Sequence, residues 1–280
     1  MSHNLTPVSQ YTGNVTVPDN GDARTAESVN VALQSLADRA LYAFDQLVNG
    51  VLVGGDVVDS SDGDTLNVTD FSVIIANKLY AKAASAVTVS VLEGGGAFAN
   101  FTVYYLYAYV SAGAILFQIS VTAPDTKRVF KSGTTTHRYL CTFATNGSAD
   151  ILPFQKRGNK YTFRQSKLNA FLVLLSGAAT SYTDVDCNVS QKLVPLHAKV
   201  ATIRALYNNT DAATQNIDFR TDGDTTNTIQ AFVTNGITYA ESFDIEVTST
   251  GTSAAPVQKF EYKSTDAQLD VSIWVTGWFE

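Results

Sequence analysis

The spacing of hydrophobic positions changes near residue 50 and separates a short N-terminal region from a long β-rich one. Residues 1–22 place Pro, Gly and Asn between short β-prone pieces, a pattern typical of an extended arm that ends in a turn. From Asp22 or Thr25, either of which can cap a helix, to Leu47 the chain lacks Gly and Pro. This stretch predicts one helix, and Asn49-Gly50 supplies its expected end.

One face of the predicted helix carries an apolar stripe whose members lie three or four residues apart. They are Val29, Leu33, Leu36, Ala40, Phe44 and Leu47. Such a stripe suits a helix that lies on a sheet of its own chain, and equally three copies packed around a symmetry axis. Fewer than four heptads cannot separate these alternatives. We expect the six residues to form an oligomer interface and residues 1–22 to attach the chain to a partner surface.

After Gly50 the apolar positions alternate or form short solid runs, and glycine-rich or Asp-Gly turns separate them. The first series predicts antiparallel strands at residues 51–58, 71–80, 86–92, 101–110 and 114–122. Within residues 101–110 both alternating sets are apolar. That strand must therefore be covered on both faces, by a second sheet or by another subunit.

A second series of predicted strands follows Pro124. It comprises residues 139–144, 160–164, 170–175, 193–207, 228–234, 243–248, 257–262 and 269–276. Many short strands at fairly even spacing are typical of a sandwich or jelly-roll-like domain. The predicted fold is mainly β: an N-terminal extended arm and one amphipathic helix, followed by antiparallel β-sandwich or jelly-roll-like regions. We assign residues 1–50 to the arm and helix, 51–124 to a β-rich domain and 125–280 to a C-terminal β-sandwich domain.

Composition supports a β-rich surface, and charge divides the chain into blocks. Only 16% of the 280 residues are charged, below the roughly 25% of an average domain. The net charge is −7 over residues 1–124, +8 over 125–210 and −8 over 211–280. The middle block predicts a basic patch formed by Lys127, Arg128, Lys131, Arg138, Lys156, Arg157 and Lys160.

Two interpretations of this patch are open. It could contact an anionic partner, such as nucleic acid or acidic surface polysaccharide, or it could face acidic segments of the same or a neighbouring subunit. We favour the second interpretation. A pI of 4.9 argues against dedicated nucleic-acid binding.

Candidate chemistry is sparse. His3, His137 and His197 have no spacing that would place two of them on one metal, and no nucleophile signature such as G-x-S-x-G occurs. Cys141 and Cys187 are too few for a disulfide framework or a four-ligand zinc site, and a bridge between them stays open. We therefore expect no enzymatic activity, no cofactor and no metal.

Two acidic loops, residues 59–64 and 222–224, resemble pieces of calcium loops, but Asp-Gly is also a common hairpin turn. We favour the turn. Trp274, Trp278 and Phe279 cluster near the C-terminus as candidate aromatics. They suit either a sugar-stacking platform or a subunit interface, and we prefer the interface.

The first residues have no basic region followed by an apolar one, so we expect synthesis in a cytoplasm without an export signal. Apolar runs reach five or six residues, whereas a membrane helix needs about twenty. No membrane insertion is expected.

Three stretches resemble bacteriophage and prophage virion proteins of the tail-fibre and appendage type. VPDNGDARTAESVN at 17–30, continued by LADR at 36–39, is similar to their N-terminal attachment segment. TNG at 145–147 and ILPF at 151–154, together with Tyr139, Leu140, Phe143, Gly158, Asn159 and Tyr161, resemble the start of a recurrent C-terminal β domain. VTGWFE at 275–280 is similar to the usual end of that domain.

The resemblance implies a homotrimer in the virion that docks by its N-terminal segment on other virion proteins and displays the β domain for adhesion, for example to host surface polysaccharide. A capsid head fibre or decoration protein is the alternative within the same setting. A lectin-like carbohydrate-binding β-sandwich is a further alternative, and an appendage depolymerase ranks last.

Overall fold

The computed structural model describes residue 36 and residues 51–164, 171–189, 191–211, 213–234, 236–252 and 255–280. The predicted arm and all of the apolar stripe except Leu36 lie outside the described residues. Leu36 is helical and 55% exposed. The oligomer interface assigned to Val29, Leu33, Leu36, Ala40, Phe44 and Leu47 stays a prediction.

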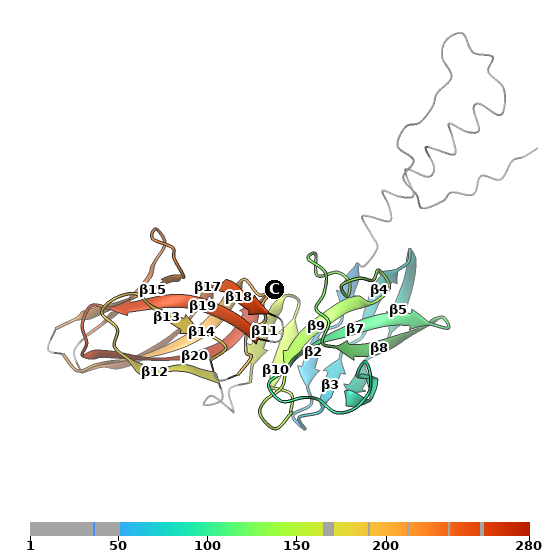
Figure 1. Cartoon of the computed structure of the whole chain (residues 1–280), viewed down its shortest axis with the longest axis horizontal. Coiled ribbons are helices and arrows are strands. Elements are labelled where there is room, and N and C mark those ends of the chain that lie inside the picture. The colour runs from blue at the N-terminus through green and yellow to red at the C-terminus, as the bar shows by residue number, and fades with distance from the viewer. Residues whose placement is uncertain are drawn as a thin grey trace, which may run out of the picture.

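The described chain consists of antiparallel β-sheets, which confirms the mainly-β prediction (Figure 1). The largest sheet has the order β17-β14-β20-β11-β10-β2-β3-β6, and β12 shares one edge of β20 with β11. Its strands are β2 (Val57–Asp59), β3 (Thr65–Val68), β6 (Ser85–Thr88), β10 (Phe154–Arg157), β11 (Lys160–Phe163), β12 (Leu172–Gly177), β14 (Val200–Asn209), β17 (Thr238–Glu246) and β20 (Leu269–Phe279).

Three smaller sheets complete the described fold. One has the order β1-β4-β5, with β1 (Leu52–Gly54), β4 (Phe71–Ile75) and β5 (Lys78–Lys82). The second has the order β8-β7-β9, with β7 (Val103–Ser111), β8 (Ala114–Ser120) and β9 (Arg138–Ala144). The third has the order β13-β19-β15-β16, with β18 on β19; its strands are β13 (Thr183–Asp186), β15 (Gln215–Thr221), β16 (Ile229–Val233), β18 (Thr248–Thr252) and β19 (Ala255–Ser264). A 3₁₀ turn, η1 (Val89–Val91), follows β6.

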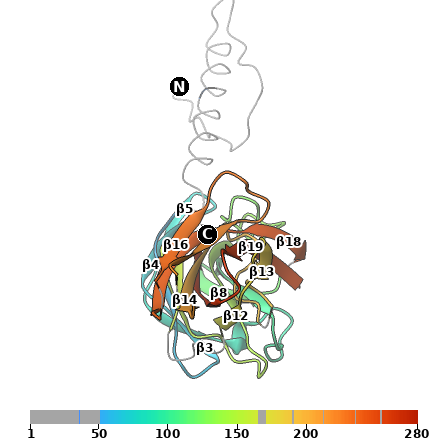
Figure 2. The same cartoon turned by 90° about the vertical axis from the view of Figure 1, so that its left-hand side faces the viewer.

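The strands gather in two lobes placed end to end (Figures 1 and 2). We call the lobe of β1 to β9 the N-lobe and the lobe of β12 to β20 the C-lobe; β10 and β11 lie between them, close to the C-terminus. The largest sheet runs through both lobes because β10 pairs with β2 and β11 pairs with β20. Strand β9 pairs with β7 across the predicted boundary at residue 124. The domain limits stay a prediction.

Both lobes place their apolar positions as the periodicity predicts. All six residues from Val103 to Ala108 of β7 are buried, and β8 and β9 flank the strand. In the C-lobe, alternate residues of β14 and β20 point inward. Tyr207 of β14 packs there against Phe219 of β15 in the facing sheet, and Phe219 also packs against Phe260 of β19 in its own sheet. This arrangement is a β-sandwich, as predicted.

Two predicted strands are each broken in two by turns. Gly54 and Gly55 have φ of +80° and +78°, so residues 51–58 form β1 and β2 rather than one strand. The predicted strand 71–80 is a hairpin, because Ala76 and Asn77 adopt φ of +49° and +61° between β4 and β5. No glycine marks that second turn, so the apolar pattern alone did not reveal it.

Candidate functional site

A buried polar network lies where the two lobes meet. Its centre is Oε1 of Glu280, which accepts a hydrogen bond from the Tyr161 hydroxyl at 2.8 Å and from Nε2 of His197 at 3.0 Å. The Tyr139 hydroxyl donates to the same oxygen. Thr142 contacts the Tyr139 hydroxyl at 2.7 Å and His197 at 3.3 Å. Strands β9 and β11, the loop before β14 and the end of β20 therefore converge on one carboxylate.

Electrostatics favour an ionised Glu280. Burial raises the pKa of this carboxyl, but the hydrogen bonds from His197, Tyr139 and Tyr161 lower it more, and the resulting pKa lies below the usual value. Burial and the nearby Glu280 charge raise the pKa of both tyrosine hydroxyls. The tyrosines therefore stay protonated and act as donors to a charged acceptor.

His197 connects this network to an open cleft of about 460 Å³. One wall is the turn at Pro124, Asp125, Thr126 and Arg128; the other contains Leu196, His197, Ala198, Lys199, Val247 and Ser249. The His197 side chain is 17% exposed, so its ring forms part of the wall while Nε2 points to Glu280.

The cleft is cationic. The side chains of Arg128 and Lys199 have no ion pair or hydrogen bond among the described residues, although both line the cleft. The carboxylate of Asp125, which also lines it, accepts from the backbone N–H groups of Val129 at 2.8 Å and Phe130 at 3.4 Å. Its charge thus holds the turn together, while two unpaired cations remain available to an anionic ligand.

The hydrogen bonds of His197 and Ser249 decide which of their polar atoms can face the cleft. With Nε2 directed at Glu280, Nδ1 of His197 is the ring atom left to accept or donate a proton. Of the hydroxyls that line the cleft, Ser249 is held instead by the Leu196 carbonyl at 2.8 Å and by Gln258 at 2.7 Å. The hydroxyl within reach of His197 is that of Thr142, 3.3 Å from Nε2, and it also contacts the Tyr139 hydroxyl inside the buried network.

The predicted basic patch does not form as one surface. Lys131 is buried and pairs with Glu93 at 2.6 Å. Lys156 is also buried, and Arg138 donates to the backbone carbonyl of Val129 at 2.6 Å, while burial lowers its pKa to about 10. The remaining members, Lys127, Arg128, Arg157 and Lys160, keep exposed or half-buried positions. Residues 125–210 carry a net positive charge, but the fold buries two of their lysines, Lys131 in the N-lobe and Lys156 on β10 between the lobes.

One of the three C-terminal aromatics, Trp278, differs from the prediction. Trp278 is 2% exposed and stacks on Tyr161 with ring centroids 4.3 Å apart, so it belongs to the core instead of an interface or a sugar platform. Its position on β20 next to β11 explains the burial. Trp274 and Phe279 are half-buried, and Nζ of Lys160 lies 5.1 Å from the Phe279 ring.

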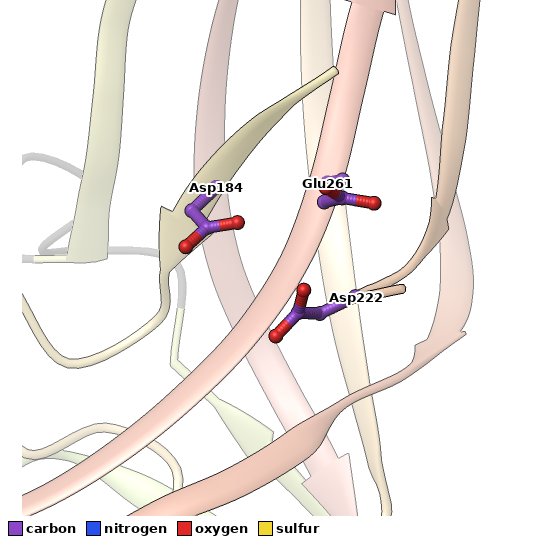
Figure 3. Close-up of side chains that lie close together, drawn as sticks. All are labelled: Asp184, Asp222 and Glu261. Atoms are coloured by element: carbon purple, nitrogen blue, oxygen red, sulfur yellow. The ribbon is translucent and has the colours of Figure 1, made fainter. Parts of the chain in front are cut away.

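A second cluster lies on the C-lobe, where Asp184, Asp222 and Glu261 bring carboxylate oxygens within 4.8 Å of one another (Figure 3). Strands β13 and β19 and the turn after β15 supply them. Oxygen ligands of this kind are those that hard cations prefer.

Each carboxylate of the cluster already has a partner. Lys259 donates to Asp184 at 2.6 Å, which raises the lysine pKa. Arg220 donates to Glu261 at 2.6 Å, and Thr248 donates to Asp222 at 3.0 Å. The cluster is therefore an ion-pair network on the sandwich surface, and we do not assign it a metal.

The acidic loops behave as the turn prediction requires. Oδ1 of Asp224 accepts from the backbone N–H of Thr226 at 2.7 Å, and the hydrogen bonds from Thr226 lower its pKa to about 2. In the other loop, Oδ1 of Asp62 accepts from the backbone N–H of Thr65 at 3.0 Å. Asp59 is buried and accepts from the N–H of Phe154 at 2.9 Å, so it ties β10 to the N-lobe.

The cysteines and histidines are not brought together in the described structure. Cys141 and Cys187 are both buried and unpaired, so the open question of a bridge is settled in favour of free thiols. His137 stacks on Tyr109 with ring centroids 4.8 Å apart, and His197 belongs to the cleft. His3 lies outside the described residues.

Sequence reasoning missed the cleft and its network. Glu280 and His197 are 83 positions apart, and neither has neighbours that mark a site. The closest signal was the similarity of residues 275–280 to a recurrent domain ending, because that similarity includes the terminal acid.

Comparisons with known proteins add little. No family model matches this chain, and no curated protein matches it. Two similar solved structures are an exo-β-1,3-galactanase from Phanerochaete chrysosporium with β-1,3-galactotriose and the same enzyme with galactose. Each is 11% identical; the matches cover 79% and 80% of this chain and 67% of the galactanase, with TM-scores of 0.27 and 0.25. Similarities of this size do not define the fold or activity of this chain.

Within the described residues, no helix combines the length and apolar character needed to cross a bilayer.

Proposed function

We propose that the chain is a structural virion protein of a bacteriophage, a homotrimeric tail-fibre or appendage subunit. Its N-terminal segment docks on other virion proteins, and its β lobes are displayed for adhesion to host surface polysaccharide. The proposed role is binding, with no bond made or broken in the ligand.

The observation that carries the adhesive part of this proposal is the cleft between the lobes. It combines two cations that have no ion pair among the described residues, Arg128 and Lys199, with apolar wall positions such as Leu196 and Val247. Sugars bind through such mixed walls, and a carboxylate on the sugar gains charge-assisted hydrogen bonds from the two cations. We therefore assign an acidic polysaccharide as the ligand class.

Binding to a defined oligosaccharide tests the adhesive role. The purified chain would be titrated by calorimetry with an oligogalacturonide and with its methyl-esterified form, which has the same sugars without the charge. We expect binding of the acidic form alone. Arg128→Ala and Lys199→Ala should each weaken it at least tenfold, because a hydrogen bond to a charged group contributes about 1.5–3 kcal/mol. Lys127→Ala is the matched control, since Lys127 is exposed beside Arg128 and does not line the cleft.

Three results would contradict the proposal. Equal binding of both forms would remove the role of the cations, and release of reducing ends would indicate an enzyme. Binding by a stable monomer would favour the lectin-like alternative. Antibody labelling of virions that contain the chain would separate a tail location from a head fibre or decoration protein.

A further inference from the structure

One face of the small β1-β4-β5 sheet is free of charge. Pairing places Val53 beside Ser72 and Ser72 beside Ala81, while Ile74 lies beside Leu79 and donates its N–H to the carbonyl of Val51. Paired residues of antiparallel strands point to the same side of the sheet. Two cross-strand rows, Val51–Ile74–Leu79 and Val53–Ser72–Ala81, therefore form this outer face.

The opposite face of the same sheet is the covered one. Phe71, Val73 and Ile75 of β4 are buried in the N-lobe core, and alternation sends Ser72 and Ile74 outward. Both lysines of β5 belong to the covered side: Lys78 lies over the Tyr80 ring and Lys82 over the Phe117 ring. The outer face keeps its apolar character without a lysine to shield it.

The face is exposed as well as apolar. Val53 is 67% exposed and Leu79 is 66% exposed, and nothing among the described residues covers them. Contiguous apolar faces are uncommon on the surface of a free chain, and they mark contact sites. Figure 1 shows β4 and β5 at the far end of the N-lobe from the C-lobe, so the two-lobe packing leaves this face open.

The position of the face along the chain indicates its partner. Val51 follows the last residue of the predicted apolar stripe, Leu47, by four positions, which span at most about 14 Å. If the stripes of three copies pack around an axis, each chain must therefore enter β1 close to that axis. The outer faces of the three sheets then meet next to the helical seam.

Charge favours copies of the same chain on this face. The chain carries a net charge of −7, and contacts on a threefold axis itself bring identical residues of the three copies together. Charged side chains there would repel their own copies, and this face has none. Six side chains are far fewer than the roughly 20–30 residues per side of a standard interface, so the face would act together with the stripe.

We infer that the outer face formed by Val51, Val53, Ser72, Ile74, Leu79 and Ala81 packs against the same face of the other two copies in the homotrimer. This inference rests on the trimer of the proposed function. It extends the predicted interface from the N-terminal segment into the first sheet of the N-lobe.

The first test is the native mass of full-length variants as a function of concentration. Val53→Asp and Leu79→Asp should raise the concentration at which trimers dissociate at least tenfold. Leu175→Asp should leave it unchanged, since Leu175 is 69% exposed on β12 of the C-lobe. A monomeric wild type would overturn the proposed trimer and this inference together. A wild-type trimer whose Val53→Asp and Leu79→Asp variants dissociate like wild type would overturn this inference alone.

A milder variant guards against misfolding. Val53→Cys introduces an accessible thiol into a chain whose two native cysteines are buried. Its maleimide labelling should be at least tenfold slower than that of Leu175→Cys in the trimer, and the protection should disappear on dilution to monomer. Rapid labelling in the trimer would show an open face, and protection independent of concentration would show cover by the chain's own N-terminal segment. Either result overturns the inference.

Discussion

Replacing Glu280 with glutamine tests the network behind the cleft. The substitution keeps the shape of the side chain and removes its charge. Three donors, Tyr139, Tyr161 and His197, lose a charged acceptor. A hydrogen bond to a charged group contributes about 1 kcal/mol more than a neutral one, so the upper limit of the loss is about 3 kcal/mol. In a chain of this size about 3 kcal/mol corresponds to a fall of roughly 6–12 °C in the unfolding midpoint.

The pKa of Glu280 determines how the stability difference between the variant and wild type changes with pH. The folded pKa of Glu280 lies below its usual value. The ionised carboxylate therefore stabilises the folded chain above the unfolded pKa, and this stability is lost as pH falls through the folded pKa. The Glu280→Gln variant should be less stable than wild type at neutral pH, and the difference should shrink progressively in acid.

Thermal unfolding of both proteins at several pH values measures the difference directly. Glu246→Gln is the matched control, because Glu246 is an exposed carboxylate on β17 with no partner among the described residues. It should unfold like wild type throughout. A Glu280→Gln variant with wild-type stability at neutral pH, or with the same deficit at every pH, would refute an ionised Glu280 at the centre of the network.

Two further predictions concern the core. Gly277→Ala should destabilise the chain by about 3 kcal/mol, because a Cβ there would lie 2.1 Å from the backbone oxygen of Tyr161 where β20 pairs with β11; an unchanged unfolding midpoint would contradict that pairing. Cys141 and Cys187 should not react with a thiol reagent in the native chain at mild alkaline pH and should both react in denaturant, because burial raises the pKa of each thiol. Prompt native labelling would disprove their burial.

Several elements followed directly from the sequence. The doubly apolar run in residues 101–110 required cover on both faces, and β7 is buried in that way by its own chain. The sequence also predicted a strand at residues 269–276, and these residues lie within β20. These predictions succeeded because side-chain alternation is a local property of the backbone.

The site was beyond the reach of the same reasoning. Arg128 and Lys199 line one cleft, while Lys131 and Lys156 from the same basic block are buried. Local charge density cannot distinguish these positions, because burial depends on which strands pack together. Trp278 was assigned to a surface for the same reason, although β11 covers it.

The sequence by itself determined that the chain is mainly β, that residues 101–110 need two covered faces, and that Asp224 turns the chain. Periodicity and turn chemistry operate over a few residues, so one chain is enough to read them. Only the tertiary structure decided that His197 meets Glu280, that two cations of the cleft have no ion pair among the described residues, and that no described residue covers the outer face of β1, β4 and β5. Those outcomes depend on contacts between distant segments, and the free energy of packing the two lobes selects them rather than any local preference.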